Sequence, residues 1–169
     1  MVEDIIDSDL ASVQTSDWDF NDAVFDVRFE NVNNQNYAVI TLHAAGGTKY
    51  LTIGGQGTNG KEVHEALGVE TGTMVNTGNG MGTTRPVAIF RIPVADNVDN
   101  ANQIPVYVGA QELTAQKGKA TQKLCVPTDV KWMKERVQFI NSYDQFKDYV
   151  NSNTPDNWYE SVKNTENLY

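Results

Sequence analysis

The stretch DWDFNDAVFDVRF, residues 17–29, carries the clearest strand signal in the chain. In its second half, Phe25, Val27 and Phe29 alternate with Asp26 and Arg28. A period of two places the apolar side chains on one face of a half-buried strand and the charged ones on the other. We therefore expect a β-strand over residues 23–29.

Runs of the same kind recur between clusters of Asn and Gly, which favour turns. They predict further strands at residues 37–43, 49–53, 87–94 and 104–108. Several short strands with no long helix between them indicate an antiparallel sandwich or barrel. We expect one domain over residues 1–169, mostly β, folded as a jelly-roll-like antiparallel β-sandwich with one or two short helices.

The two helices are predicted from their end signals. Asn59 and Glu62 resemble a capping arrangement, and Gly68 is a typical residue just after a helix. Ser142 and Gln145 have the spacing of a capping box, and an apolar stripe follows them before a proline. The clearer helix is therefore expected near the C-terminus.

Composition excludes several classes of protein. The 169 residues are 40% hydrophobic, which is ample for a core. The single cysteine and two histidines cannot form a zinc-finger set or an internal disulfide. The net charge of −9 opposes binding to nucleic acid. No window approaches the ~20 apolar residues of a membrane span.

The negative charge is concentrated at the start of the chain. Residues 1–27 contain eight of the 22 acids and no Lys or Arg, whereas the other 14 acids are nearly balanced by 13 bases. No basic or apolar leader-like segment follows Met1, which predicts a cytosolic protein, a mature fragment or an excised domain. The acidic segment is expected to contact a positively charged group.

Within this segment, Asp17, Asp19 and Asn21 alternate with Trp18 and Phe20. In an extended chain the three polar side chains would converge on one side, and the aromatic pair would anchor the other. Oxygen ligands of this kind select hard cations, above all Ca²⁺. The pattern therefore predicts a calcium site.

The acidic motif has two alternative interpretations. The motif begins like an EF-hand loop, but Asp22 stands where a glycine is needed and Arg28 where a bidentate glutamate is needed. A solvated acidic loop remains open. Two carboxylates ~5 Å apart repel by about 3 kcal/mol at an effective dielectric constant of ~20, so a gathered cluster favours a bound cation.

No residue pattern indicates catalysis. His43 and His64 are expected on the surface, and Cys125 is expected to be a buried, inert thiol because its neighbours are apolar. A hydrolase with two carboxylates facing a cleft is the least favoured interpretation. We expect a protein that is not an enzyme.

Short segments in order along nearly the whole chain resemble the LruC-type domain, a poorly characterised module of exported proteins and lipoproteins of gut Gram-negative anaerobes. Met133 departs from the family pattern, which has proline there. The matching segments are EDI (3–5), DWDFND (17–22), KEVHEALG (61–68), MVNTG (74–78), LCVPTDVKW (124–132), KERV (134–137) and WY (158–159).

The resemblance implies a β-sandwich-like fold, export to the periplasm or cell surface, and an acidic site compatible with calcium. It supplies no catalytic activity. The positions that match the acidic motif, and that we expect to ligate the metal, are Glu3, Asp4, Asp17, Asp19, Asn21 and Asp22.

The leading hypothesis is a non-catalytic, calcium-stabilised module for interaction or adhesion, with calcium and a surface protein as partners. The alternative is a carbohydrate-binding module that holds a glycan with calcium or exposed aromatic residues. Its candidate platforms are Trp132, Trp158 and Tyr159, although a buried anchor for the C-terminus is the commoner role for such residues.

Overall fold

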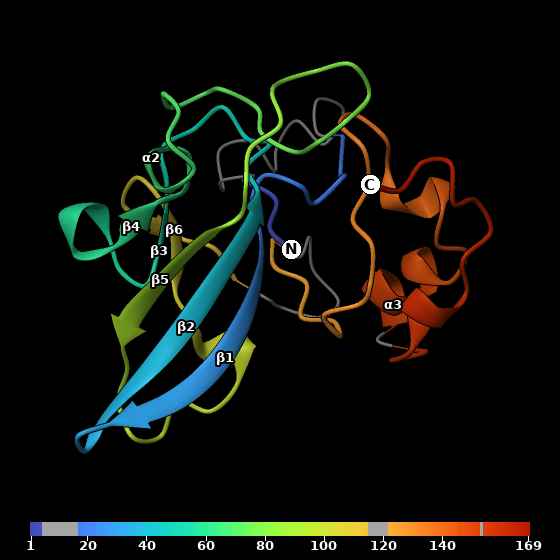
Figure 1. Cartoon of the computed structure of the whole chain (residues 1–169). Helices are drawn as coiled ribbons and strands as arrows, with labels where there is room; N and C mark the ends of the chain where they lie inside the picture. Colours follow the sequence, from blue (N-terminus) through green and yellow to red (C-terminus); the bar gives the residue numbers. More distant parts are fainter. Residues whose placement is uncertain (5–16, 115–121, 153) are drawn as a thin grey trace.

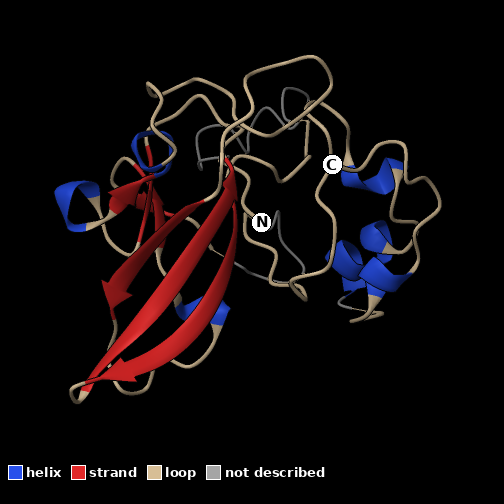
Figure 2. Cartoon of the chain, viewed as in Figure 1, coloured by secondary structure: helices blue, strands red, loops and turns tan. Residues whose placement is uncertain are grey.

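The computed structural model describes residues 1–4, 17–114, 122–152 and 154–169. Its described part consists mainly of two antiparallel sheets with two short α-helices, one of them near the C-terminus (Figure 2). The mostly β fold predicted from sequence is confirmed. Asp7 and Asp9 of the acidic segment lie outside the described residues.

The larger strands form a three-stranded sheet in the order β1 (Val24–Val32), β2 (Gln35–Ala44) and β5 (Ala88–Pro93). Strands β1 and β2 make a hairpin whose register runs from Val24 opposite Ala44 to Val32 opposite Gln35. Asn33 and Asn34, with φ of 52° and 63°, form its turn, as expected for a two-residue hairpin loop.

The second sheet has the order β4-β3-β6-β7, built from very short strands. Their bounds are β3 Leu51–Ile53, β4 Lys61–Glu62, β6 Val106–Val108 and β7 Gln111–Glu112. The sequence pattern predicted β3 and β6 approximately and missed β4 and β7. Two-residue strands are too short to show a period of two.

The helical elements are also short, and neither predicted cap is as expected. Helix α2 (Val63–Ala66) is capped by Glu62, whose side chain accepts from the backbone N–H of Glu65, and not by Asn59. Helix α3 (Phe146–Ser152) begins four residues after Ser142, whose hydroxyl is buried without a hydrogen-bond partner in the described structure. Single 3₁₀ turns lie at Gly57–Asn59, Ala101–Gln103, Phe139–Asn141 and Trp158–Glu160.

Two hydrophobic clusters hold these elements together. The first lies between the sheets and joins Ile40 and Leu42 of β2 to Ile53 of β3 and Val106 of β6. The second is largely aromatic and consists mainly of residues from 124–158, which Met1, Phe20, Val24 and Ala44 join from the first part of the chain. Figure 1 shows α3 and the C-terminal turns on the opposite side of the molecule from β3 and β4.

No helix in the described part of the chain has the length and apolar character needed to cross a membrane.

Candidate functional site

The acidic segment is held against the start of the chain. Val2 forms bridges to Asn21 on one side and to Lys123 on the other, so residues 1–3 lie between two segments that are distant in sequence. This arrangement carries Glu3 to the motif at residues 17–22. The side chain of Glu3 accepts a hydrogen bond from the backbone N–H of Phe20 at 3.0 Å.

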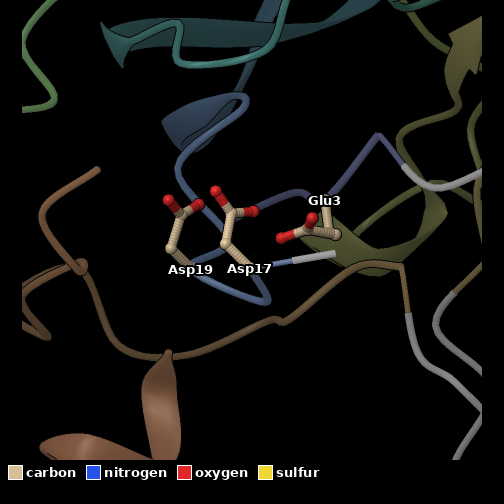
Figure 3. Close-up of side chains that lie close together, drawn as sticks. All are labelled: Glu3, Asp17 and Asp19. Atoms are coloured by element: carbon tan, nitrogen blue, oxygen red, sulfur yellow. The ribbon is translucent and has the colours of Figure 1, made fainter. Parts of the chain in front are cut away.

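Three carboxylates meet at this point. Glu3, Asp17 and Asp19 each offer an oxygen, and these oxygens all lie within 4.8 Å of one another. Figure 3 shows Asp17 between the other two, with the carboxylate of Glu3 directed towards it. Glu3 and Asp19 are only 3% and 2% exposed, so water can reach this group from few directions. The cluster has the composition and spacing to hold a metal ion.

The backbone of the motif is not the extended chain expected from the sequence. Trp18 and Phe20 adopt left-handed conformations, with φ of 51° and 53°. Such values are strained for bulky residues. Phe20 is fully buried in the aromatic cluster, where its ring meets Phe139 edge-on at 5.4 Å. The acids and the aromatic residues still separate, but through left-handed turns at alternate residues.

The carboxylate of Asp19 is fixed by backbone donors. One oxygen accepts from the N–H of Asn21 at 3.2 Å, and the other accepts from the N–H of Arg136 at 2.7 Å. Among the residues that the structure describes, neither Asp17 nor Asp19 forms an ion pair with Lys or Arg. The two acids therefore gather without a neutralising side chain in contact.

The pKa values of these acids are raised because the carboxylates are buried close together. Burial raises the pKa of Asp19 to about 8, and the charges of Asp17 and Glu3 act in the same direction. Burial also raises the pKa of Asp17. The pKa of Asp22 is raised well above its ordinary value by burial and then by Glu3 and Asp4. Without a cation, burial and the neighbouring charges thus favour the protonated form of Asp19 at neutral pH.

The remaining predicted ligands lie beside the three carboxylates. Asp22 accepts from the backbone N–H of Asp4 at 2.6 Å, and Asp4 forms an ion pair with Lys49 at 3.3 Å. Gly47 packs against both acids so closely that a Cβ there would lie 2.7 Å from Asp4 Oδ2. The acidic segment contains no Lys or Arg of its own, and Lys49 supplies a base from another part of the chain.

Asn21 is fully buried and reaches the C-terminal part. Its Nδ2 donates to the carbonyl of Met133 at 3.2 Å, while its Oδ1 has no hydrogen-bond partner in the described structure. Sequence reasoning missed Glu135, which is 4% exposed and whose Oε2 is likewise buried and without a partner there. Glu135 lies in the matching segment KERV (134–137), but nothing in the sequence connects that segment to the acidic motif, from which it is far along the chain.

Two expectations about single residues are wrong. His64 is fully buried, not on the surface, because Glu62 at 2.7 Å and the carbonyl of Gly47 at 2.9 Å satisfy its two ring nitrogens. Cys125 is exposed, not buried. It lines a cavity of about 220 Å³ together with His43 and Asp26, whose side chains lie 2.8 Å apart.

The aromatic residues considered as glycan platforms are engaged within the protein. Trp158 is 2% exposed and packs against Phe146 at 4.9 Å, which is the anchoring role expected for a C-terminal tryptophan. Tyr159 meets its ring edge-on at 5.7 Å. Trp132 stacks on Tyr169 at 5.2 Å, and its indole nitrogen donates to the carbonyl of Asn76.

Comparisons of the chain with models of protein families, with curated proteins and with solved structures find no match. The resemblance to the LruC-type domain therefore stays a prediction, and the conclusions about the site depend on its own geometry.

Proposed function

We propose that this chain is a non-catalytic β-sandwich module that binds and is stabilised by calcium, in an exported or cell-surface bacterial protein. The observation that carries the calcium proposal is the group formed by Glu3, Asp17 and Asp19, with oxygens within 4.8 Å of one another. Two oxygens on opposite sides of a Ca²⁺ ion, each at about 2.4 Å, span that distance. Export, and a role in interaction or adhesion, follow from the family resemblance.

The donor chemistry favours calcium over other metals. The group contains oxygens only, which excludes the nitrogen and sulfur preferences of zinc and copper. Mg²⁺ demands a tight octahedron at about 2.0–2.1 Å and keeps several waters, whereas Ca²⁺ accepts six to eight oxygens in flexible geometry. Buried carboxylates with backbone-fixed positions suit the larger ion.

The electrostatic balance supports the same proposal. An ion pair with Lys or Arg is absent from Asp17 and Asp19 in the described structure, and the pKa of Asp19 is raised to about 8 by burial and by its acidic neighbours. The attraction of a bound divalent cation for the carboxylates would outweigh their mutual repulsion and lower their pKa values, so that they stay ionised. Binding to the folded state alone would then stabilise the fold.

The test is isothermal titration calorimetry with CaCl₂ on a variant in which Asp4, Asp17, Asp19 and Asp22 are replaced with Asn. We expect the wild-type protein to bind calcium and the variant to lose binding. A matched control replaces four exposed acids with Asn and removes the same charge: Asp96, Asp99, Asp129 and Asp148. If the site variant binds calcium as well as this control does, the assignment is wrong.

A further inference from the structure

Glu135 is placed at the acidic site by two anchoring contacts on either side of it. The carbonyl of Met133 accepts from Asn21 Nδ2 at 3.2 Å, and the backbone N–H of Arg136 donates to Asp19 Oδ2 at 2.7 Å. The segment 133–136 is thus braced against the motif at both ends. Glu135 lies between these contacts, and its own N–H donates to the carbonyl of Thr77 at 2.9 Å.

The carboxylate of Glu135 is buried with one oxygen unused. The residue is 4% exposed, and in the described structure Oε2 has no hydrogen-bond partner. Thr77 Oγ1 and Asn21 Oδ1 are also buried and without a partner there. Of these three oxygens only Glu135 Oε2 belongs to a carboxylate, and a buried carboxylate oxygen without a partner costs several kcal/mol, so its position favours a cation that would accept its lone pair.

The charge of Glu135 acts on the acidic group. Burial raises the pKa of Glu135 and the charge of Asp17 raises it further, whereas the charge of Arg136 and the side chains of Thr77 and Asn21 lower it. Glu135 in turn contributes to the raised pKa of Asp19. The carboxylate therefore lies within electrostatic reach of both acids, on the side where the C-terminal part meets the motif.

We propose that Glu135 is a ligand of the calcium ion bound by Glu3, Asp17 and Asp19, with Asn21 Oδ1 as a neutral ligand beside it. This inference rests on the proposed function. The carboxylate would move towards the ion on binding, because the group whose oxygens already lie within 4.8 Å of one another contains only Glu3, Asp17 and Asp19. Two more oxygens bring the protein ligands close to the six to eight that Ca²⁺ takes.

With Glu135 as a ligand, the calcium ion would connect separate parts of the chain. Its ligands would come from residue 3, from the motif at 17–21 and from residue 135, which are three separate parts of the chain. Residue 135 leads directly into the aromatic cluster of Phe139, Phe146 and Trp158. Calcium would then fasten this C-terminal unit to the start of β1.

The test compares Glu135→Gln with Glu70→Gln, which removes the same charge from an exposed position. Calcium affinity is measured by calorimetry, and the melting temperature is measured in EDTA. We expect Glu135→Gln to bind calcium at least about tenfold more weakly than Glu70→Gln, because ligand charge sets calcium affinity. We also expect its melting temperature in EDTA to be equal or higher, because one repelling charge is gone.

The outcomes separate the two proposals. If wild type fails to bind calcium, the proposed function is wrong. If wild type binds and Glu135→Gln stays within twofold of the control, Glu135 is not a ligand. A lower melting temperature of Glu135→Gln in EDTA, with unchanged affinity, would show an ordinary structural role and overturn the inference. Glu135→Asp, which keeps the charge on a shorter side chain, is expected to have intermediate affinity.

Discussion

In the absence of a cation, the protein is expected to lose stability as the pH rises from about 4 to about 8, because Asp19 resists ionisation only in the folded state. Its pKa is raised from 3.8 to about 8 by burial and by Asp17 and Glu3. Below pH 4 the acid is protonated in both states and costs nothing. Between the two pKa values the folded state binds the extra proton, so stability falls as pH rises.

The magnitude follows from the width of this window. Each pH unit inside it costs 1.36 kcal/mol for one group, so the step from pH 5.5 to 7.5 lowers the free energy of unfolding by about 2.7 kcal/mol. For a chain of this length, 1 kcal/mol moves the melting temperature by about 2–4 °C. The melting temperature in EDTA is therefore expected to fall by ~5–11 °C over this step.

The assay is a thermal melt followed by circular dichroism in EDTA at the two pH values, for wild type and Asp19→Asn. Asn keeps one acceptor oxygen and cannot ionise, so the variant lacks this contribution. The pKa of Asp22, which the charge of Asp19 helps to raise, is also lowered, and this change further reduces the pH dependence of the variant. Its melting temperature should fall by ~5–11 °C less than that of wild type. Equal pH dependence of the melting temperature in the two proteins would refute the claim that folding raises the pKa of Asp19.

Three further outcomes are expected. At pH 7.5, 1 mM calcium should raise the melting temperature by ~5–11 °C over EDTA if the dissociation constant is about 10 μM, and magnesium should do much less; equal shifts with both ions would contradict the selectivity. Trp158→Ala should lower the free energy of unfolding by about 3–5 kcal/mol in urea titrations, whereas Val162→Ala, at a residue 41% exposed, should change it by about 0.5 kcal/mol or less. Cys125 is exposed and should react with a thiol reagent in the native protein at nearly its rate in urea; strong protection would show that the segment around it is covered.

The hairpin of β1 and β2 could be predicted because its information is local. The alternation of Phe25, Val27 and Phe29 gives the strand its half-buried apolar face, and Asn33 and Asn34 tolerate the left-handed turn that joins it to β2. The acidic group was also predictable in part. Asp17 and Asp19 are separated by a single residue in the chain, so one turn suffices to bring their carboxylates together.

Features set by distant contacts could not be predicted. The burial of His64 depends on Glu62 and on the carbonyl of Gly47, and no periodicity reports such a partner. Cys125 was misjudged because its neighbours are apolar. Leu124 is buried at 4% exposure while the next residue, Cys125, is exposed, so apolar neighbours in sequence do not report the burial of a single side chain.

The alternation of acids with aromatic residues has an energetic consequence for the site. Burying a phenylalanine contributes roughly 1.5–3 kcal/mol, and aromatic pairs add about 0.5–1.5 kcal/mol each. Phe20 is fully buried and pairs with Phe139 and Phe146. These contacts are of the same order as the repulsion of about 3 kcal/mol between two carboxylates ~5 Å apart.

Hydrophobic anchoring can therefore hold Asp19 in place before any ion arrives. Backbone donors from Asn21 and Arg136 fix the orientation of its carboxylate in the same state. An ion that enters such a site need not order these groups, so little of its binding free energy is lost to conformational entropy. The left-handed conformations of Trp18 and Phe20 accompany this separation, and the packing of Phe20 in the aromatic cluster helps to offset their strain.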